Sequence, residues 1–312
     1  MEKEKEMKLE VRNLKKSFGD KEVLHGISFQ VESGMALGLL GRNGAGKTTT
    51  IRILMDVFKA NSGEILIDGR PFVAKNYRIG YLPEERGLYP KKKVKDQMIY
   101  LARLKGVSKG EAMANVDRWL ERLEVMEYKE KKLETLSKGN QQKVQLATTL
   151  VADPDIVILD EPFSGLDPVN SQILKDVVNE LIAEGKLVIF SSHQMAYVEE
   201  FCDNISIINH GDVVLEGRLK EIKKEYGRNR LVIAAENYSL DELATKIGND
   251  FSDIVSVDKK KKEFLVLQMN DNVSKEGVLT RIVGSDIKLE RFGIYEPSLN
   301  DIFVAKAGEE SE

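Results

Sequence analysis

The sequence has a single cysteine, Cys202, among 312 residues. One cysteine cannot form a disulfide within the chain or supply a cysteine zinc cluster, so we interpret Cys202 as a small, buried apolar residue. Basic residues are not in excess either. The formal net charge is −4, whereas a dedicated nucleic-acid-binding protein usually carries a clear basic surplus. These shortages argue against a disulfide-stabilised scaffold, a cysteine-based zinc site and a nucleic-acid partner.

Long apolar runs are also missing. None approaches the roughly 18–20 residues that cross a bilayer, and the run Ile156–Leu159 has the length of a buried strand. The first residues, Met1–Glu6, are charged and are not followed by the apolar segment of a signal peptide. We therefore expect a cytoplasmic protein in a reducing compartment.

The sequence does contain enough apolar material for about two globular domains, with 42% hydrophobic and 31% charged residues over its length. Alternating apolar and polar positions in residues 8–31 predict an antiparallel β-region. Short apolar strands that alternate with helices between residues 36 and 208 predict an α/β core with a parallel sheet. Helical periodicity in about residues 85–150 predicts a helical subdomain inserted in this core.

A polar, glycine-containing linker at residues 226–230 predicts a domain boundary. We place a large first domain at 1–228 and a small accessory domain at 229–312. Within the second domain, strand-like and helical patterns alternate and predict an α+β fold. The strand-like segments are 231–235 and 264–269, and the helical ones are 240–247 and 275–283.

Residues 41–48, GRNGAGKT, fit the G-x4-G-K-[ST] pattern of a phosphate-binding loop. The loop follows an apolar strand and opens a predicted helix, where backbone N–H groups and the helix N-terminus favour phosphate. We expect Lys47 to reach the β- and γ-phosphates and Thr48 to ligate Mg²⁺. A chance glycine-rich turn is the alternative. The expected nucleotide-binding residues here are Gly41, Asn43, Gly44, Ala45, Gly46, Lys47, Thr48 and Thr49.

A second pair of candidates, Asp160 and Glu161, ends an apolar strand. Asp160 can hold the Mg²⁺ shell, and Glu161 can act as the general base for the attacking water. Solvated acids at a strand end are the alternative, which the phosphate-binding loop on the same chain disfavours. The guanine-specific Asn-Lys-x-Asp element is absent from the sequence, which argues against a GTPase of the Ras type.

Taken in order, six elements across about residues 8–225 resemble those of the ABC ATPase family. They are Phe18, where the adenine-stacking aromatic belongs, the loop at 41–48, Tyr81-Leu82-Pro83-Glu84, the signature-like Leu136-Ser137-Lys138-Gly139-Asn140, Asp160-Glu161 with Ser164-Gly165-Leu166-Asp167, and His193. A core aromatic is the alternative for Phe18, and a surface histidine for His193.

This resemblance implies a P-loop ABC ATPase fold that binds ATP and Mg²⁺. It implies that Glu161, His193 and Lys47 are catalytic, and that Thr48, Asp160 and Glu84 hold the metal. Two copies would dimerise head to tail, as a homodimer or with a paralogue. Ser137, Gly139 and Asn140 of one copy would then cap the ATP bound by the other.

Two departures from the family pattern are visible. Glu84 stands where Gln is usual, and a carboxylate cannot donate a hydrogen bond as an amide does. In the signature, Lys138 replaces the first glycine and Asn140 replaces Gln. Because Glu161 and His193 are present, we do not expect a dead site.

The tail at 295–303, YEPSLNDIF, resembles a subgroup with a small C-terminal domain that serves exporters, including sodium, drug and antibiotic-resistance exporters. It is also compatible with a helix that caps the accessory domain. We expect an exporter ATPase held at the inner face of the cell membrane by a separate permease. A soluble translation or DNA-repair ATPase and a regulatory ATP-binding module are the alternatives. We interpret the lysine runs at 91–93 and 259–262 as solvated, with a weak attraction of the first to anionic membranes.

Overall fold

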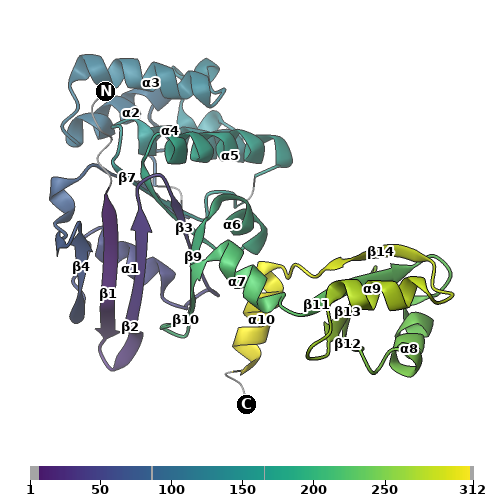
Figure 1. Cartoon of the computed structure of the whole chain (residues 1–312). Helices are drawn as coiled ribbons and strands as arrows, with labels where there is room; N and C mark the ends of the chain where they lie inside the picture. The colour runs from purple at the N-terminus through teal and green to yellow at the C-terminus, as the bar shows by residue number, and fades with distance from the viewer. Residues whose placement is uncertain (1–6, 86, 165, 310–312) are drawn as a thin grey trace, which may run out of the picture. The chain divides into compact units, whose positions relative to one another are not determined.

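The computed structural model describes residues 7–309 except residues 86 and 165, so Met1–Glu6 and Gly165 lie outside the described part. The chain divides into two compact units between Leu219 and Lys220, and each unit is described by itself (Figure 1). The predicted fold class, an α/β ATPase core followed by a small α+β domain, is confirmed. The boundary predicted after residue 228 falls just past helix α7 (Leu219–Tyr226) and stays a prediction.

The first unit contains an antiparallel sheet with strand order β2-β1-β4-β5. The alternating pattern of residues 8–31 forms its two long strands, whose apolar residues point to one face. Gly19, with a φ of 58°, supplies the turn between them. The strands are β1 (Lys8–Phe18), β2 (Lys21–Glu32), β4 (Ser62–Ile67) and β5 (Arg70–Pro71).

A second sheet has the order β10-β9-β3-β8-β7-β6, in which the five strands from β9 to β6 are parallel and β10 is antiparallel. Its central strands are buried along their whole length, so they appear in the sequence as continuous apolar runs. The strands are β3 (Ala36–Leu40), β6 (Ile79–Leu82), β7 (Ile156–Asp160), β8 (Leu187–Ser192), β9 (Asn204–Asn209) and β10 (Asp212–Arg218).

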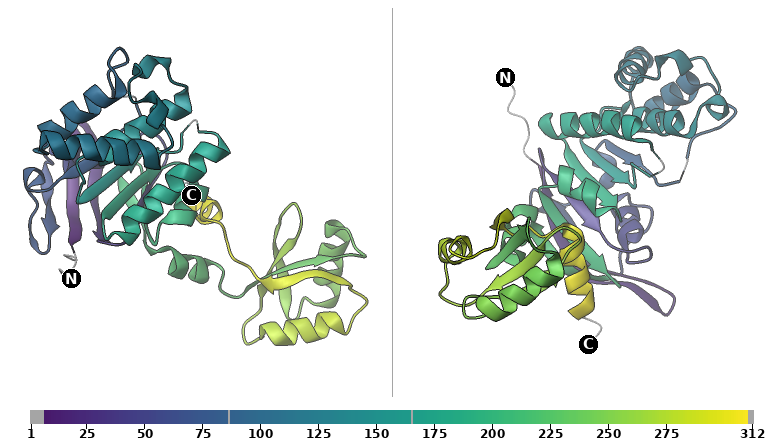
Figure 2. Two further views of the ribbon diagram at one scale, coloured as in Figure 1. Left: turned by 90° about the horizontal axis from the view of Figure 1, so that it is seen from above. Right: turned by 90° about the vertical axis from the view of Figure 1, so that its right-hand side faces the viewer.

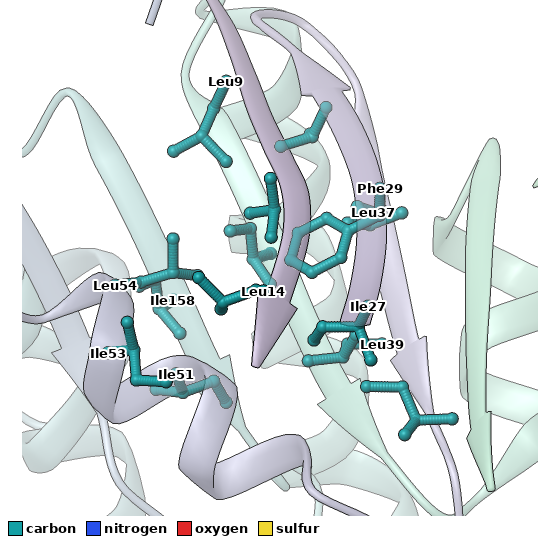
Figure 3. Packing of buried hydrophobic residues seen from close by; sticks show 14 of the residues in the cluster. Leu9, Leu14, Ile27, Phe29, Leu37, Leu39, Ile51, Ile53, Leu54 and Ile158 are labelled. Atoms are coloured by element: carbon teal, nitrogen blue, oxygen red, sulfur yellow. The ribbon is translucent and has the colours of Figure 1, made fainter. Parts of the chain in front are cut away.

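The main core lies between these two sheets and includes helix α1 (Lys47–Leu54) (Figure 3). Helix α1 ends at Leu54, shortly before Asp56, which takes a left-handed φ of 57°. Helices α5 (Pro168–Ala183) and α6 (Met195–Phe201) pack against β8. Cys202, at the end of α6, is buried as predicted.

The helical part of this unit consists of α2 (Val94–Leu104), α3 (Lys109–Arg122) and α4 (Lys138–Leu150) (Figure 2). Ser108 caps α3 by accepting a hydrogen bond from the amide of Glu111. One face of α3 is buried through Ala112, Val116, Trp119 and Leu120. Short 3₁₀ turns lie at Ala74–Asn76 (η1), Met126–Tyr128 (η2) and Leu133–Thr135 (η3).

The second unit contains an antiparallel sheet with the order β12-β13-β11-β14. Helices α8 and α9 cover one face with an apolar cluster that includes Leu231, Leu243, Leu267 and Ile282. The strands β12 and β14 were not predicted, because most of their side chains are polar or at least partly exposed. The elements are β11 (Arg230–Ala235), α8 (Leu240–Asp250), β12 (Val255–Lys260), β13 (Leu265–Met269), α9 (Lys275–Val283), β14 (Leu289–Ile294) and α10 (Leu299–Glu309).

Across the described residues 7–85, 87–164 and 166–309, no helix is both long enough and apolar enough to cross a membrane.

Candidate active site

Four of the predicted site segments follow the carboxyl ends of parallel strands β3, β6, β7 and β8, which are all in one sheet. Because parallel strands end at the same edge, segments that are far apart in sequence meet there. The segments after β3, β6 and β7 border a cleft of about 400 Å³, whose lining does not include His193. The cleft is lined by Phe18, Lys21, Val23, Asn43, Gly44, Gly46, Lys47, Thr48, Thr49, Glu84, Asp160 and Glu161.

A larger hollow, of about 720 Å³, lies near the opposite edge of this sheet and includes Gly34, Asp155 and Lys186. None of the predicted site residues lines it. We therefore locate the chemistry in the smaller cleft, where the phosphate-binding loop and the carboxylates are.

The phosphate-binding loop has the backbone shape that its glycines predict. Gly46 has a φ of 118°, and a Cβ atom there would lie 2.6 Å from Leu24 Cδ2. Helix α1 starts at the next residue. Its N-cap residue, Gly46, has no side chain that could accept a hydrogen bond from the first N–H groups of the helix. The first N–H groups of α1 therefore suit an anion such as phosphate.

Lys47 is buried in this loop, where its ammonium donates to the carbonyl of Gly41 (2.7 Å) and is 3.4 Å from that of Arg42. Burial lowers the pKa of Lys47, and the carboxylates of Glu161, Asp160 and Glu84 oppose this change. An ammonium facing three carboxylates explains how a charged lysine is tolerated here. It also leaves the cleft with an excess of negative charge before any phosphate binds.

Asp160 is buried at the end of β7 and is held by two hydroxyl groups. Ser191 Oγ donates to Oδ1 (2.8 Å), and the phenol of Tyr81 lies 3.4 Å from Oδ2. Burial raises the pKa of Asp160, while the hydrogen bond from Ser191 lowers it. Burial and the nearby Asp160 carboxylate raise the pKa of Tyr81 to about 12, so the phenol remains a donor at neutral pH.

Glu161 is also buried, and its backbone has a φ of 50°, which is unusual for a residue other than glycine. Its carboxylate accepts hydrogen bonds from Ser192 Oγ (3.0 Å) and from the amide of His193 (2.7 Å). The imidazole Nδ1 of His193 lies 2.6 Å from the same carboxylate. A carboxylate with fixed donors in a cleft has the arrangement of a positioned general base.

A divalent cation would find only part of its coordination shell in this chain. Among the described residues, no three His, Cys, Asp or Glu side chains converge on one metal position. Thr48, Asp160 and Glu84 do contribute to the same cleft, and their oxygen atoms suit Mg²⁺. Mg²⁺ usually keeps water and phosphate oxygens as ligands, so an incomplete protein shell fits a cation that arrives with a nucleotide.

Phe18 lies at the end of β1 and is 49% exposed at the rim of the cleft. Its ring packs edge-on against Phe58, with 5.2 Å between the ring centres. This exposure excludes the alternative that Phe18 is a fully buried core residue, and it leaves ring surface available for stacking on a base.

The signature-like residues do not line the cleft of their own chain. Ser137 caps α4 by accepting from the amide of Asn140 (3.3 Å), and its side chain is exposed. Gly139 lies against the Asn170 side chain, where a Cβ atom would be 2.9 Å from Nδ2. Ser137, Gly139 and Asn140 therefore lie at the start of α4, where the Ser137 side chain is exposed and Gly139 and Asn140 are half-buried.

The sequence analysis assigned no role to Ser191 or Ser192 and named Tyr81 only as part of the segment that ends at Glu84, yet all three hydroxyl groups hold the two carboxylates. It also missed Lys21 and Val23, which line the cleft from β2. The available signal was position, since Ser191 and Ser192 directly precede His193 at the end of a buried strand.

Two models of known protein families match this chain. The family model described as "ABC transporter" matches residues 24–164. The one described as "ATP-binding protein DrrA1-3-like, C-terminal domain" matches residues 217–307.

Among curated proteins, the chain is 43% identical over 305 residues to the uncharacterized ABC transporter ATP-binding protein YhaQ of Bacillus subtilis (strain 168), covering 96% of this chain and 98% of that protein. It is 36% identical over 213 residues to the Nod factor export ATP-binding protein I of Burkholderia lata, covering 67% and 70%. A solved structure of the ATP-binding subunit of an ABC transporter has a TM-score of 0.65 at 30% identity, covering 77% of this chain and 99% of that one.

Proposed function

Since this chain belongs to the ATP-binding proteins of ABC transporters, which bind and hydrolyse ATP, we propose that it drives export through a separate membrane permease. The export direction is supported by the similarity to the Nod factor export ATP-binding protein I. One observation carries the proposal: Lys47 and Glu161, which come from different strand ends, line one cleft.

In the proposed mechanism, the phosphate groups of ATP bind at the N-terminus of α1, and Lys47 contacts the β- and γ-phosphates. Phe18 stacks on the adenine. Thr48, Asp160 and Glu84 would hold Mg²⁺, which would offset the negative charge of the phosphates when bound. Without such a cation, Glu84, Asp160 and Glu161 would repel the nucleotide.

Glu161 accepts a proton from the water that attacks the γ-phosphate in line. His193 positions this carboxylate through its amide and imidazole. Ser137, Gly139 and Asn140 complete the site from a second copy of the chain or from a paralogue, in a head-to-tail dimer. Closing and opening of this dimer provides the mechanical output.

We further propose that the chain is held at the inner face of the cell membrane by two permease subunits. The test is co-expression with the permease encoded next to it, followed by purification of the membrane fraction. We expect the chain to copurify with the permease and the complex to hydrolyse ATP faster than the isolated chain. A chain that stays with ribosomes or DNA and never with the permease would refute the transport role.

A further inference from the structure

Two lysine-rich segments that are far apart in the sequence lie side by side in the helical part of the first unit. Residues 91–95 and 129–133 run antiparallel, with Lys93 and Lys132 paired as an isolated bridge. Backbone hydrogen bonds of 3.0–3.1 Å flank this bridge. They run from the amides of Val94, Lys95 and Leu133 to the carbonyls of Lys131, Lys129 and Lys92, respectively.

This pairing gathers seven lysines, which we call the lysine patch. They are Lys91, Lys92, Lys93, Lys95, Lys129, Lys131 and Lys132. Glu130 neutralises part of the patch by pairing with Lys93 and Lys95, and Asp117 pairs with Lys129.

The other four lysines have no carboxylate partner within the described part of the chain, and all four are exposed. They are Lys91, Lys92, Lys131 and Lys132. The patch therefore carries unpaired positive charge on a chain whose net charge is −4.

One exposed and one half-buried tyrosine accompany these lysines. Tyr89 is 55% exposed just before the first segment. The ammonium of Lys131 lies 4.8 Å from the ring centre of Tyr128, which precedes the second segment. Lysine next to tyrosine on one surface is typical of protein segments at the membrane–water interface, where the ring sits at headgroup level.

We propose that the lysine patch binds the anionic headgroups of a membrane surface directly. All seven basic residues are lysines, and a lysine ammonium acts on phosphate as a flexible point charge. Base-specific recognition of nucleic acid usually relies on the planar fork of arginine, which the patch lacks. Each lysine near an anionic surface strengthens binding by about fivefold. This contact requires no second protein, so it is independent of the proposed permease.

The test is co-sedimentation of the full chain, without nucleotide, with phosphatidylcholine vesicles that contain or lack phosphatidylglycerol. We expect binding only to the anionic vesicles and weaker binding at high salt, because salt screens exposed charges. The triple variant Lys91→Ala, Lys92→Ala, Lys132→Ala should bind about a hundredfold more weakly.

The matched control is Lys259→Ala, Lys262→Ala, Lys288→Ala, which removes the same charge from exposed sites in the second unit. It should bind as the wild type does. A third variant, with arginine at positions 91, 92 and 132, keeps the charge and should keep the binding. Equal thermal melting of all variants shows that loss of binding is not loss of folding.

Three outcomes would overturn the proposal. They are equal binding to vesicles without phosphatidylglycerol, equal loss in the patch and control variants, and no vesicle binding by the wild type. If the wild type does not bind vesicles and the patch variant no longer associates with the permease, the lysine patch binds an acidic protein segment instead.

Discussion

Nδ1 of His193 lies 2.6 Å from Oε1 of Glu161, and the amide of His193 donates to the same oxygen. An ionised carboxylate can only accept hydrogen bonds, so Nδ1 must carry a hydrogen in this arrangement. The imidazole is half exposed, whereas the carboxylate is buried. Glu161 therefore fixes both the tautomer and the orientation of His193, so the proposed base and the predicted catalytic histidine act as a pair.

The first prediction concerns Glu161→Gln. The amide is close in shape to the carboxylate but is a poor proton acceptor, so ATP turnover should fall by roughly 10²–10⁴-fold while ATP binding persists. Because ATP is not consumed, we expect a stable ATP-dependent dimer. Size-exclusion chromatography with and without ATP, alongside a phosphate-release assay, measures both effects.

The matching control for that experiment is Lys47→Ala, which removes the ammonium from the phosphate loop. It should bind ATP weakly and remain a monomer. If Glu161→Gln binds ATP and yet stays monomeric, the signature with Lys138 and Asn140 does not close the site alone. The permease or the second unit would then have to bring the two copies together.

The second prediction concerns Glu84→Gln. Glu84 lies close enough to Lys47 to oppose the lowering of its pKa, so it adds negative charge to the cleft. Removing that charge should raise the Mg²⁺ concentration needed for half-maximal ATP binding by severalfold, because one oxyanion ligand is lost. Titration of Mg²⁺ against fluorescent ATP binding measures this shift. Glu85→Gln, one residue further on and outside the cleft lining, is the control and should leave the Mg²⁺ requirement unchanged. An unchanged requirement in Glu84→Gln would remove Glu84 from the metal site.

The third prediction concerns pH. Burial raises the pKa of Asp301, but Lys261, Ser298 and Tyr295 outweigh this effect and lower it to about 2. A folded pKa below the unfolded value of 3.8 contributes stability above pH 3.8, and this is lost as the pH falls towards 2. Asp301→Asn should therefore destabilise the second unit by about 2 kcal/mol at pH 7 and progressively less below pH 4.

Amide hydrogen exchange of β11 at several pH values measures this difference in stability, since β11 is one of the two central strands of the second unit. Asp271→Asn, at an exposed position of the same unit, is the control and should change little. The lowered pKa of Asp301 would be contradicted if the stability difference between Asp301→Asn and the wild type stayed constant from pH 7 to pH 3.

The fourth prediction concerns the approach of α6 to the parallel sheet. A Cβ atom at Gly38 in β3 would lie 2.4 Å from Val198 Cγ1 and 3.2 Å from Cys202 Sγ. Because α6 follows His193, Gly38→Ala should both destabilise the first unit by about 1–3 kcal/mol and slow turnover. Urea unfolding followed by the fluorescence of Trp119 reports the stability. Gly110→Ala in α3, where a Cβ meets no atom within 4 Å, should be neutral or slightly stabilising. Equal urea midpoints for Gly38→Ala and Gly110→Ala would show that α6 moves away from the added methyl group with little loss of stability.

Much of the cleft follows from the sequence because its parts have strong local signals. The glycine spacing around Lys47 permits only a few backbone shapes, and the apolar run before Asp160 permits only a buried strand. Parallel strands then bring their carboxyl ends together, so Lys47, Asp160 and Glu161 meet without further information.

Other features depend on contacts that no local pattern encodes. The bridge between Lys93 and Lys132 joins segments that each resemble an ordinary solvated charge run. In the second unit, the sequence pattern did not predict β12, because only Val255 of that strand is buried. The hydrogen bonds of Ser191 and Ser192 to the carboxylates likewise depend on the register of β7 against β8.

Helix α4 starts at the signature and also reaches the segment that carries Glu84. Gln145 Nε2 lies 3.2 Å from the carbonyl oxygens of both Pro83 and Glu85, on either side of Glu84. The side-chain amide of Gln145 thus links the backbone on both sides of Glu84 to the helix that starts at the signature-like residues. A displacement of α4 must either carry Glu84 with it or break both hydrogen bonds. In the proposed dimer, Gln145 would therefore act as a mechanical link between the N-terminus of α4, where the second copy binds, and the nucleotide cleft of the first copy.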